Sequence, residues 1–525
     1  MEERCSQVDQ MGQVYRNAKQ VIAWLGYQRW NSSLALDFAE RLYNSFPQHL
    51  DKGTEGELQH GRQRLNRQDV EAVQELFMDP KYAREWLALH NFIRYRPYWG
   101  RAWIFQEMLL AKRIVFLCGA RSATWGLVQA AMQIIVDTHK PVTNLINQSV
   151  PIPDQDAPFL VDQDNPHSLH PLYWQFMLTA FEGRHYMKNS YASSTLSNTT
   201  ERWLELINHR RCLLPHDKIY AIMGIVPPAV AAEMPKTNYD QQVQQVYKQF
   251  AKAYVLGTKS LNILSLSHHT DTQHDLPSWV LDWRREQRIS GVHDIAGAVG
   301  TNSHRNWHSS ALSKYPAEFS SDISELSVYG LRYGIVQRKR LEEKLMPKLK
   351  KVTLTKQDSH TDPTYPTYVR EVWLVEDGFR EILEDAKFKS EFFLHDRANT
   401  LLRIMLYLQD PERFAALRPS NERPKSQPET TFLVNRELHH HSAGRTVVET
   451  DELDLGLAPV WTETGDIVCQ FFGLTAAVVL RSLGGAKYKF IGACYVLGKM
   501  GDDAIKMLKG TMNTCPEKIE KFTLV

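Results

Sequence analysis

The stretch that most constrains the fold is residues 96–119, RPYWGRAWIFQEMLLAKRIVFLCG. Proline favours the first turn of a helix, so Pro97 predicts a helix start at this point. Large side chains and an amide then recur at spacings of four, three and four, at Trp99, Trp103, Gln106 and Leu110. This spacing places them on one helical face. Residues 114–118, IVFLC, follow as an apolar strand.

Glu107 lies on the same predicted face, four residues beyond Trp103. A carboxylate beside large rings is costly to bury unless it is paired or hydrogen-bonded. Arg101 is six residues away, which is not a one-face helical spacing, so it reaches Glu107 only through loop geometry. Two interpretations stay open: a buried structural ion pair at a helix start, or a functional acid beside aromatic rings.

The same stretch resembles the signature of the fungal heterokaryon-incompatibility (HET) domain, which reads tryptophan-x-arginine-x-tryptophan followed by glutamine-glutamate. The residues that carry the resemblance are Trp99, Arg101, Trp103, Gln106 and Glu107. Residues 3–26 resemble the helix of the family and its strand that ends in tryptophan-leucine-glycine. Four segments in addition to the signature agree with the family in chain order, over nearly the whole length.

Residues 211–224, RCLLPHDKIYAIMG, resemble a second motif of the family, an arginine followed by proline-x-aspartate-lysine-isoleucine-tyrosine. The resemblance assigns to this motif Arg211, Asp217, Lys218 and Tyr220. A carboxylate in the first turn of a helix interacts favourably with the helix dipole, so a structural role for Asp217 is as open as a catalytic one. Residues 276–283 and 465–498 are similar to segments further along the family.

One departure concerns the start of the chain. Family members usually open with a tyrosine-x-x-leucine-serine-tyrosine-x-tryptophan-glycine stretch and a strand, and this sequence starts at Met1, just after the place where those elements would lie. We therefore expect a HET domain that lacks its N-terminal start. A gene start set too late and a shortened member both explain this.

The resemblance also implies a fold, since HET domains are thought to be remote relatives of TIR domains with a flavodoxin-like parallel sheet. We expect a partial α/β HET domain over residues 1–138, N-terminally incomplete, and a linker or insertion over 139–200. A helical region that continues the HET-protein core should span 201–290. A mixed α+β region should span 320–525, with a disordered stretch near 409–430.

Local patterns predict several individual elements. Helix and strand signals alternate in the first 138 residues, which favours a parallel sheet. Residues 21–25 read as a strand and residues 124–138 as a helix. A helix is also predicted near residues 369–384, and an antiparallel sheet over the last hundred residues.

Composition narrows the function classes. The 525 residues carry 62 basic and 60 acidic side chains, a net charge of +2, so no global field argues for nucleic acid or an anionic membrane. The six cysteines stand singly, with no C-x-x-C pair, which fits a reducing compartment and a cytoplasmic location. The longest apolar run, residues 468–480, is too short to span a bilayer.

Motifs for metal, cofactor or phosphate binding do not reach a usable pattern. The spacing from Gly492 to Lys499 is too long for a phosphate loop, and Met500 cannot ligate magnesium. A second candidate is a group of polar residues that lie close together in the sequence and could ligate a metal: His268, His269, Asp271, His274 and Asp275. A flexible polar loop explains this group better than a metal site does, because nothing fixes a ligand geometry. We therefore expect no metal and no bound cofactor.

The resemblance implies three candidate functions. The first is a cytosolic self/non-self recognition and cell-death module that acts through contacts with other incompatibility proteins, allelic variants or a second copy, without nucleic acid or membrane. The second, by analogy with TIR domains, is an enzyme that cleaves NAD as its substrate, with Glu107 or Glu3 as the glutamate that stabilises an oxocarbenium-like centre. The third is an accessory or regulatory protein of a metabolite gene cluster. Enzyme activity stays open.

Overall fold

The computed structural model places most of the chain in two compact units, residues 1–246 and 247–525. The residues that it describes are 2–29, 31–45, 67–94, 96–138, 142, 145–146, 148–149, 203–204, 206–208, 210–267, 275–285, 302–340, 349–355, 369–375, 445–452, 454–496 and 499–525. The expected linker at 139–200 lies almost wholly outside them, and the stretch near 409–430 lies outside entirely.

A three-stranded sheet organises the first unit. It contains β1 (Val21–Trp24), β2 (Ile114–Cys118) and β3 (Arg121–Thr124), in the order β1-β2-β3. β1 pairs with β2 in parallel, as predicted, and β2 matches its predicted bounds. β3 corrects the expectation of a wholly parallel sheet, because it runs antiparallel to β2. The turn between them, at Gly119 (φ 59°), is too short for the crossover that parallel strands need.

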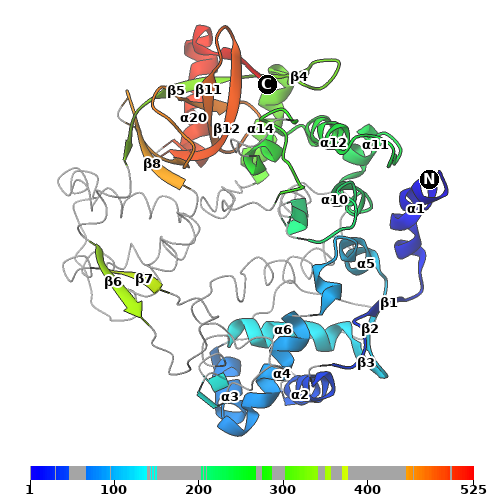
Figure 1. Cartoon of the computed structure of the whole chain (residues 1–525). Helices are drawn as coiled ribbons and strands as arrows, with labels where there is room; N and C mark the ends of the chain where they lie inside the picture. The colour runs from blue at the N-terminus through cyan, green and yellow to red at the C-terminus, as the bar shows by residue number, and fades with distance from the viewer. Residues whose placement is uncertain are drawn as a thin grey trace. The chain divides into compact units, whose positions relative to one another are not determined.

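The first unit also contains five longer helices. They are α1 (Glu2–Asn17), α2 (Ser32–Ser45), α3 (Arg67–Phe77), α4 (Ala83–Arg94) and α6 (Trp125–Asp137). α2 packs against α4 and α6, and α6 against β2 and β3 (Figure 1). Thr124 caps α6, since its Oγ1 accepts the Leu127 amide at 3.3 Å. The predicted helix at residues 124–138 is therefore confirmed.

The buried face of the sheet is lined with aromatic rings. Phe116 of β2 lies with its ring centroid 5.4 Å from Trp99 and 6.1 Å from Trp125. Tyr98 contacts Trp99 edge-on at 5.2 Å. Arg96 fixes the loop after β1, donating hydrogen bonds to the Tyr27 carbonyl at 2.6 Å and to that of Arg29 at 3.1 Å. The segment after Arg96 is thereby anchored to the end of the sheet.

The helix predicted from Trp99 is broken in two. A 3-10 turn, η2 (Pro97–Gly100), is followed by extended backbone at Arg101, and only then does α5 (Ile104–Leu110) begin. Here the backbone forms hydrogen bonds with a segment that is remote in sequence. The Gly100 carbonyl accepts a hydrogen bond from the Arg211 amide at 2.6 Å, and the Arg211 carbonyl accepts one from the Ala102 amide at 2.9 Å. This parallel bridge between Arg101 and Arg211 interrupts the helix.

The helical middle region contains four short or medium elements, and a further 3-10 turn, η1 (Pro80–Tyr82), precedes α4 in the first unit. The four elements are α10 (Asp217–Tyr220), α11 (Pro228–Glu233), α12 (Val243–Thr258) and η3 (Asn262–Leu266). Apolar side chains recur at helical spacing on α12 and are buried, at Val246, Tyr247, Phe250 and Tyr254. The boundary between the two units falls within this helix.

The second unit contains an eight-stranded sheet, and six of its strands lie in the last hundred residues, where an antiparallel sheet was predicted. Its strands are β4 (Glu318–Phe319), β5 (Leu326–Arg340), β8 (Arg445–Thr450), β9 (Leu455–Pro459), β10 (Ile467–Phe471), β11 (Ala477–Ser482), β12 (Lys487–Val496) and β13 (Glu520–Leu524). β5, β10, β11, β12 and β13 pair in succession, and β13 pairs back onto β5, so these five strands close into a ring. All these pairings are antiparallel except β12 with β13.

Two helices complete the core of this sheet. Ala311 of α14 (Asn302–Lys314) and Leu508 of α20 (Gly501–Thr514) join a buried cluster with strand residues such as Val468 and Ile491. The 3-10 turn η6 (Pro516–Lys518) then leads into β13. Strands of this sheet are buried on both faces, which explains their nearly continuous apolar sequences.

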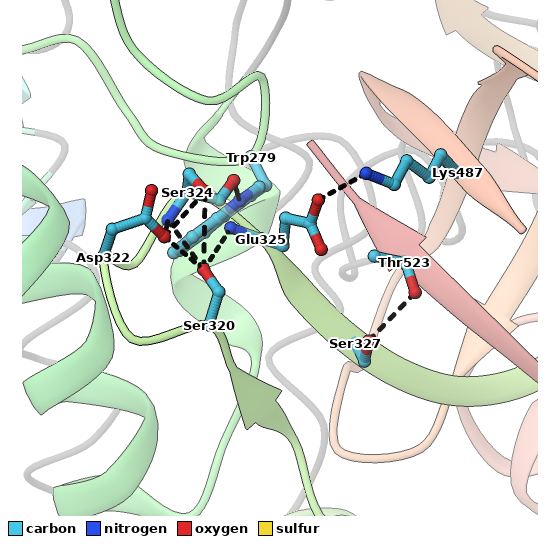
Figure 2. Close-up of polar contacts among 8 residues, drawn as sticks. All are labelled: Trp279, Ser320, Asp322, Ser324, Glu325, Ser327, Lys487 and Thr523. Atoms are coloured by element: carbon cyan, nitrogen blue, oxygen red, sulfur yellow. Dashed lines mark hydrogen bonds and ion pairs between the residues drawn. The ribbon is translucent and has the colours of Figure 1, made fainter.

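The loop before β5 is held by polar contacts (Figure 2). Asp322 accepts hydrogen bonds from the hydroxyls of Ser320 and Ser324, at 2.7 and 2.8 Å. These bonds lower the pKa of Asp322 to about 2. Lys487 pairs with Glu325 at 2.6 Å just beyond the loop.

The remaining described strands correct one prediction. β6 (Leu349–Thr355) and β7 (Val369–Val375) form an antiparallel hairpin, whereas a helix was predicted from residue 369. The sequence VREVWLV is rich in β-branched and aromatic residues, which favour a pleated strand. Within the described residues, no helix combines the length and the apolar character that crossing a bilayer requires.

Candidate functional site

Glu107 lies in the first turn of α5 with 10% of its side chain exposed. Its Oε1 is 3.3 Å from Nη2 of Arg101, and 52% of the Arg101 side chain is exposed. The two residues meet because the backbone bends at Arg101, as the loop-geometry argument required. The pair therefore joins a nearly buried carboxylate to a solvated guanidinium, and solvent screens part of its attraction.

Two tyrosines complete the surroundings of Glu107. Burial raises the pKa of Tyr15, on α1, and the negative charge of Glu107 raises it further. The pKa of Tyr98 is raised well above its usual value by the same two causes, again with burial first. Both phenols therefore keep their protons at neutral pH and surround the carboxylate with polar O–H groups.

The second motif folds directly onto the first. Besides the bridge to Arg211, Arg210 donates to the Trp99 carbonyl at 2.6 Å. Gln106 Nε2 donates to the Tyr220 carbonyl at 3.1 Å. The arginine of the motif acts here through its backbone, since its side chain is exposed. Residues more than one hundred positions apart in sequence thus form one cluster.

Lys218 has a capping geometry rather than a catalytic one. Its buried ammonium donates to the carbonyls of Ile207, at 3.1 Å, and Asn208, at 2.8 Å, and to that of Arg210. Backbone carbonyls at the end of a helical segment need such donors. A cation there also interacts favourably with the helix dipole. The lysine therefore holds the segment before the motif against α10.

Asp217 is buried and accepts a hydrogen bond of 2.6 Å from the Tyr239 hydroxyl. Burial raises the pKa of Tyr239, and the bond to Asp217 raises it further. The guanidinium of Arg4 lies 4.1 Å from the Tyr239 ring centroid, a cation–π contact. Asp217 is thus a first-turn residue of α10 whose side chain is engaged by a tyrosine rather than by the helix backbone.

Not every predicted residue joins this cluster. Trp99 is buried at its centre, and Trp103 is only partly buried before α5. Glu3 is exposed on α1, where it accepts a hydrogen bond of 3.3 Å from Gln7. It lies twelve residues from Tyr15, about 18 Å along the helix at 1.5 Å per residue. Glu3 is therefore remote from Glu107, whereas its neighbour Arg4 lies at the Tyr239 end of the cluster.

Four residues of the cluster were missed by sequence reasoning: Arg4, Tyr15, Tyr98 and Tyr239. Tyr98 stands between Pro97 and Trp99, so its place inside the signature was a usable signal. Tyr15 lies in the segment 3–26 that resembles the helix and strand of the family, but nothing in its spacing connects it to Glu107. The other two are brought in only by tertiary contacts.

Within the described part of the chain, no group of three histidine, cysteine or acidic side chains is placed to hold a metal ion. Of the polar group at residues 268–275, only Asp275 is described, and it pairs with Arg284 at 2.7 Å. Arg284 also pairs with Asp282 at 2.8 Å. The Asp275 carboxylate is therefore part of an ion-pair network with Arg284 and Asp282.

Comparison with known families finds a match in the segment that contains the first motif of the cluster. The family model described as "Heterokaryon incompatibility protein (HET)" matches residues 1–107, which include the whole Trp99–Glu107 signature. This segment is therefore similar to the HET domain over about a fifth of the chain. The Arg211–Tyr220 motif lies beyond this match, yet it is hydrogen-bonded to the last residues of the matched segment.

A curated relative covers more of the chain. The heterokaryon incompatibility protein 6, OR allele, of Neurospora crassa is 24% identical over 302 residues, which are 54% of this chain and 42% of the relative. The chain thus matches about two fifths of the length of that relative. No solved structure matches the chain.

Proposed function

We propose that this HET-domain protein is a fungal heterokaryon (vegetative) incompatibility protein, a cytoplasmic self/non-self recognition module that signals cell death through protein contacts. The HET domain and the name of the Neurospora relative support the class. The partners we propose are other incompatibility proteins, allelic variants or a second copy of the chain. A TIR-like fold is part of the proposal, supported by the parallel pair of β1 and β2.

The observation that carries the protein-contact mechanism is the unequal exposure within the signature. Arg101 keeps half of its side chain in solvent while Glu107 is nearly buried beneath it. Arginine can form two parallel hydrogen bonds with a carboxylate and can stack on rings, and it is enriched at protein interfaces. In the proposal Arg101 meets the partner, and Glu107 holds its guanidinium in place.

The test compares inducible expression of the wild-type chain and a Glu107→Gln variant in a fungal host. The substitution keeps the shape of the side chain and removes its charge. We expect the variant to accumulate to wild-type levels and to lose most of the cell death. A matched control is Glu40→Gln, since Glu40 also pairs with an arginine, Arg121 at 3.5 Å, but on the surface. Full killing by Glu107→Gln at equal protein levels would refute the role of this carboxylate.

A second candidate is NAD cleavage. Its supporting observation is that Glu107 lies beside Tyr98 and Tyr15, close to the buried Trp99. A fixed carboxylate could stabilise the positive charge that develops as the nicotinamide bond breaks. The buried Trp99 Nε1 and Gln106 Oε1 also have no hydrogen-bond partner among the described residues, and such groups often bind water or a ligand.

This candidate is tested by following nicotinamide release from NAD with the purified full chain. We expect release from the wild type and from Glu3→Gln, and none from Glu107→Gln. Glu3 is the matched control because it is an exposed glutamate outside the cluster. Absence of release from the wild type would leave the protein-contact mechanism alone.

A further inference from the structure

One face of α1 lies across the cluster at four levels of the helix. Arg4 stacks on Tyr239, and Asp9 Oδ1 accepts the Thr237 amide at 3.2 Å. One turn further, Gly12 lies against the backbone of Gly224. Tyr15 and Arg16 end the row: the first interacts with Glu107, and the second donates to the Gly224 carbonyl. Spacings of three to five residues place these side chains along one side of the helix.

This docking depends little on apolar burial. Gly12 is the single fully buried residue of α1, which has 16 residues, whereas α2 buries six of 14. Helices of globular proteins are normally held by an apolar stripe. Ion pairs and polar contacts near solvent contribute only about 0–1 kcal/mol each, so a helix held by them can open locally without global unfolding.

Closeness at Gly12 makes the docked position specific. A Cβ at Gly12 would lie 2.9 Å from the Gly224 Cα, and one at Gly224 would lie equally close to Gly12. Neither neighbour is a flexible side chain that could move aside. The two backbones approach so closely only because both residues are glycine. The contact is therefore sensitive to the addition of a single methyl group.

We propose that α1 is a reversibly docked helix that controls access to Glu107. When α1 is docked, Tyr15 covers the carboxylate; when α1 is released, Glu107, Tyr98 and the Asp217–Tyr239 pair become accessible. The opening is a physical property of this chain. Its consequence for signalling, in which the released state is the one that engages a partner, rests on the proposed function.

The experiment is hydrogen exchange of the full chain, compared for the wild type, Gly12→Ala and Gly510→Ala. Alanine stabilises a helix interior by about 1 kcal/mol relative to glycine, so propensity alone would slow exchange in both variants. Gly510 in α20 has no atom within 4 Å of an added Cβ, which makes it the matched control. We expect Gly12→Ala to speed exchange of the α1 amides by about tenfold or more, with β2 and α6 unchanged.

Cys5 gives a second readout. It is a partly buried cysteine on α1. Alkylation by N-ethylmaleimide, followed by peptide mapping, should modify Cys5 faster in Gly12→Ala than in the wild type. Cys118 is buried in β2 and serves as the internal control for global unfolding.

Three outcomes would overturn the proposal: unchanged α1 exchange in Gly12→Ala, exchange that rises equally in β2 and α6, or unchanged Cys5 labelling. If Gly12→Ala does not accumulate, the double variant Arg4→Ala/Asp9→Ala removes two docking contacts without adding volume and must give the same local opening. These readouts need no biological activity. A wild-type chain that fails to kill fungal cells would therefore refute the proposed function and leave the docking result intact.

Discussion

Replacing Lys218 with methionine tests whether the second motif is structural. Methionine keeps the apolar stem and removes the ammonium, which donates to three backbone carbonyls. One of these, Ile207, also accepts the Arg210 amide at 3.0 Å, so the loss falls mainly on the other two. At about 1.5 kcal/mol for each hydrogen bond from a charged donor, the expected destabilisation is ~3 kcal/mol.

Native-state hydrogen exchange of the full chain measures this loss without assuming that the two units unfold together. A loss of ~3 kcal/mol corresponds to about a hundredfold faster exchange, since 1.4 kcal/mol is a factor of ten. The amides to follow are those of Ile219 and Tyr220 in α10, and of β2. Lys236→Met is the control, because Lys236 is exposed in the same unit and should change stability by less than about 0.5 kcal/mol.

The reasoning would be wrong if Lys218→Met exchanged within about threefold of the wild type, a difference below 1 kcal/mol. Such a result would mean that water replaces the ammonium at these carbonyls at little cost. A stable Lys218→Met variant that had lost cell-death signalling would instead move Lys218 from a capping role to a functional one.

Two further predictions follow from the same structure. Burial, as the first cause, raises the pKa of Tyr15, Tyr98 and Tyr239 above the usual value of 10.0. The stability that these phenols contribute is therefore complete below pH 10 and is lost as pH rises above it. Tyr239→Phe should flatten this alkaline decline in unfolding free energy, measured by urea titration at a series of pH values, and a decline identical to that of the wild type would contradict the assignment. Gly510→Ala should stabilise α20 by about 0.5–1 kcal/mol, seen as slower exchange of the α20 amides, because the added methyl group meets no atom within 4 Å.

Local sequence patterns predicted the elements whose structure is decided by neighbours in the chain. The strand at Ile114–Cys118 and the helix capped by Thr124 follow from apolar runs and from a hydroxyl at a helix start. The helix predicted near residue 369 was wrong within its described part, where cross-strand pairing with β6 holds the segment extended. The helical region predicted over residues 201–290 contains α12, whose apolar side chains recur at helical spacing and are buried.

The sequence by itself determined which residues belong to the HET signature, since the order and spacing of Trp99, Arg101 and Glu107 are written in the chain. Only the tertiary structure decided how they are used. The bridge from Arg101 to Arg211 breaks the predicted helix, and the docked helix α1 brings Tyr15 to Glu107. Helical periodicity reports which side chains share a face within one element, whereas contacts between residues about one hundred positions apart depend on how separate elements pack.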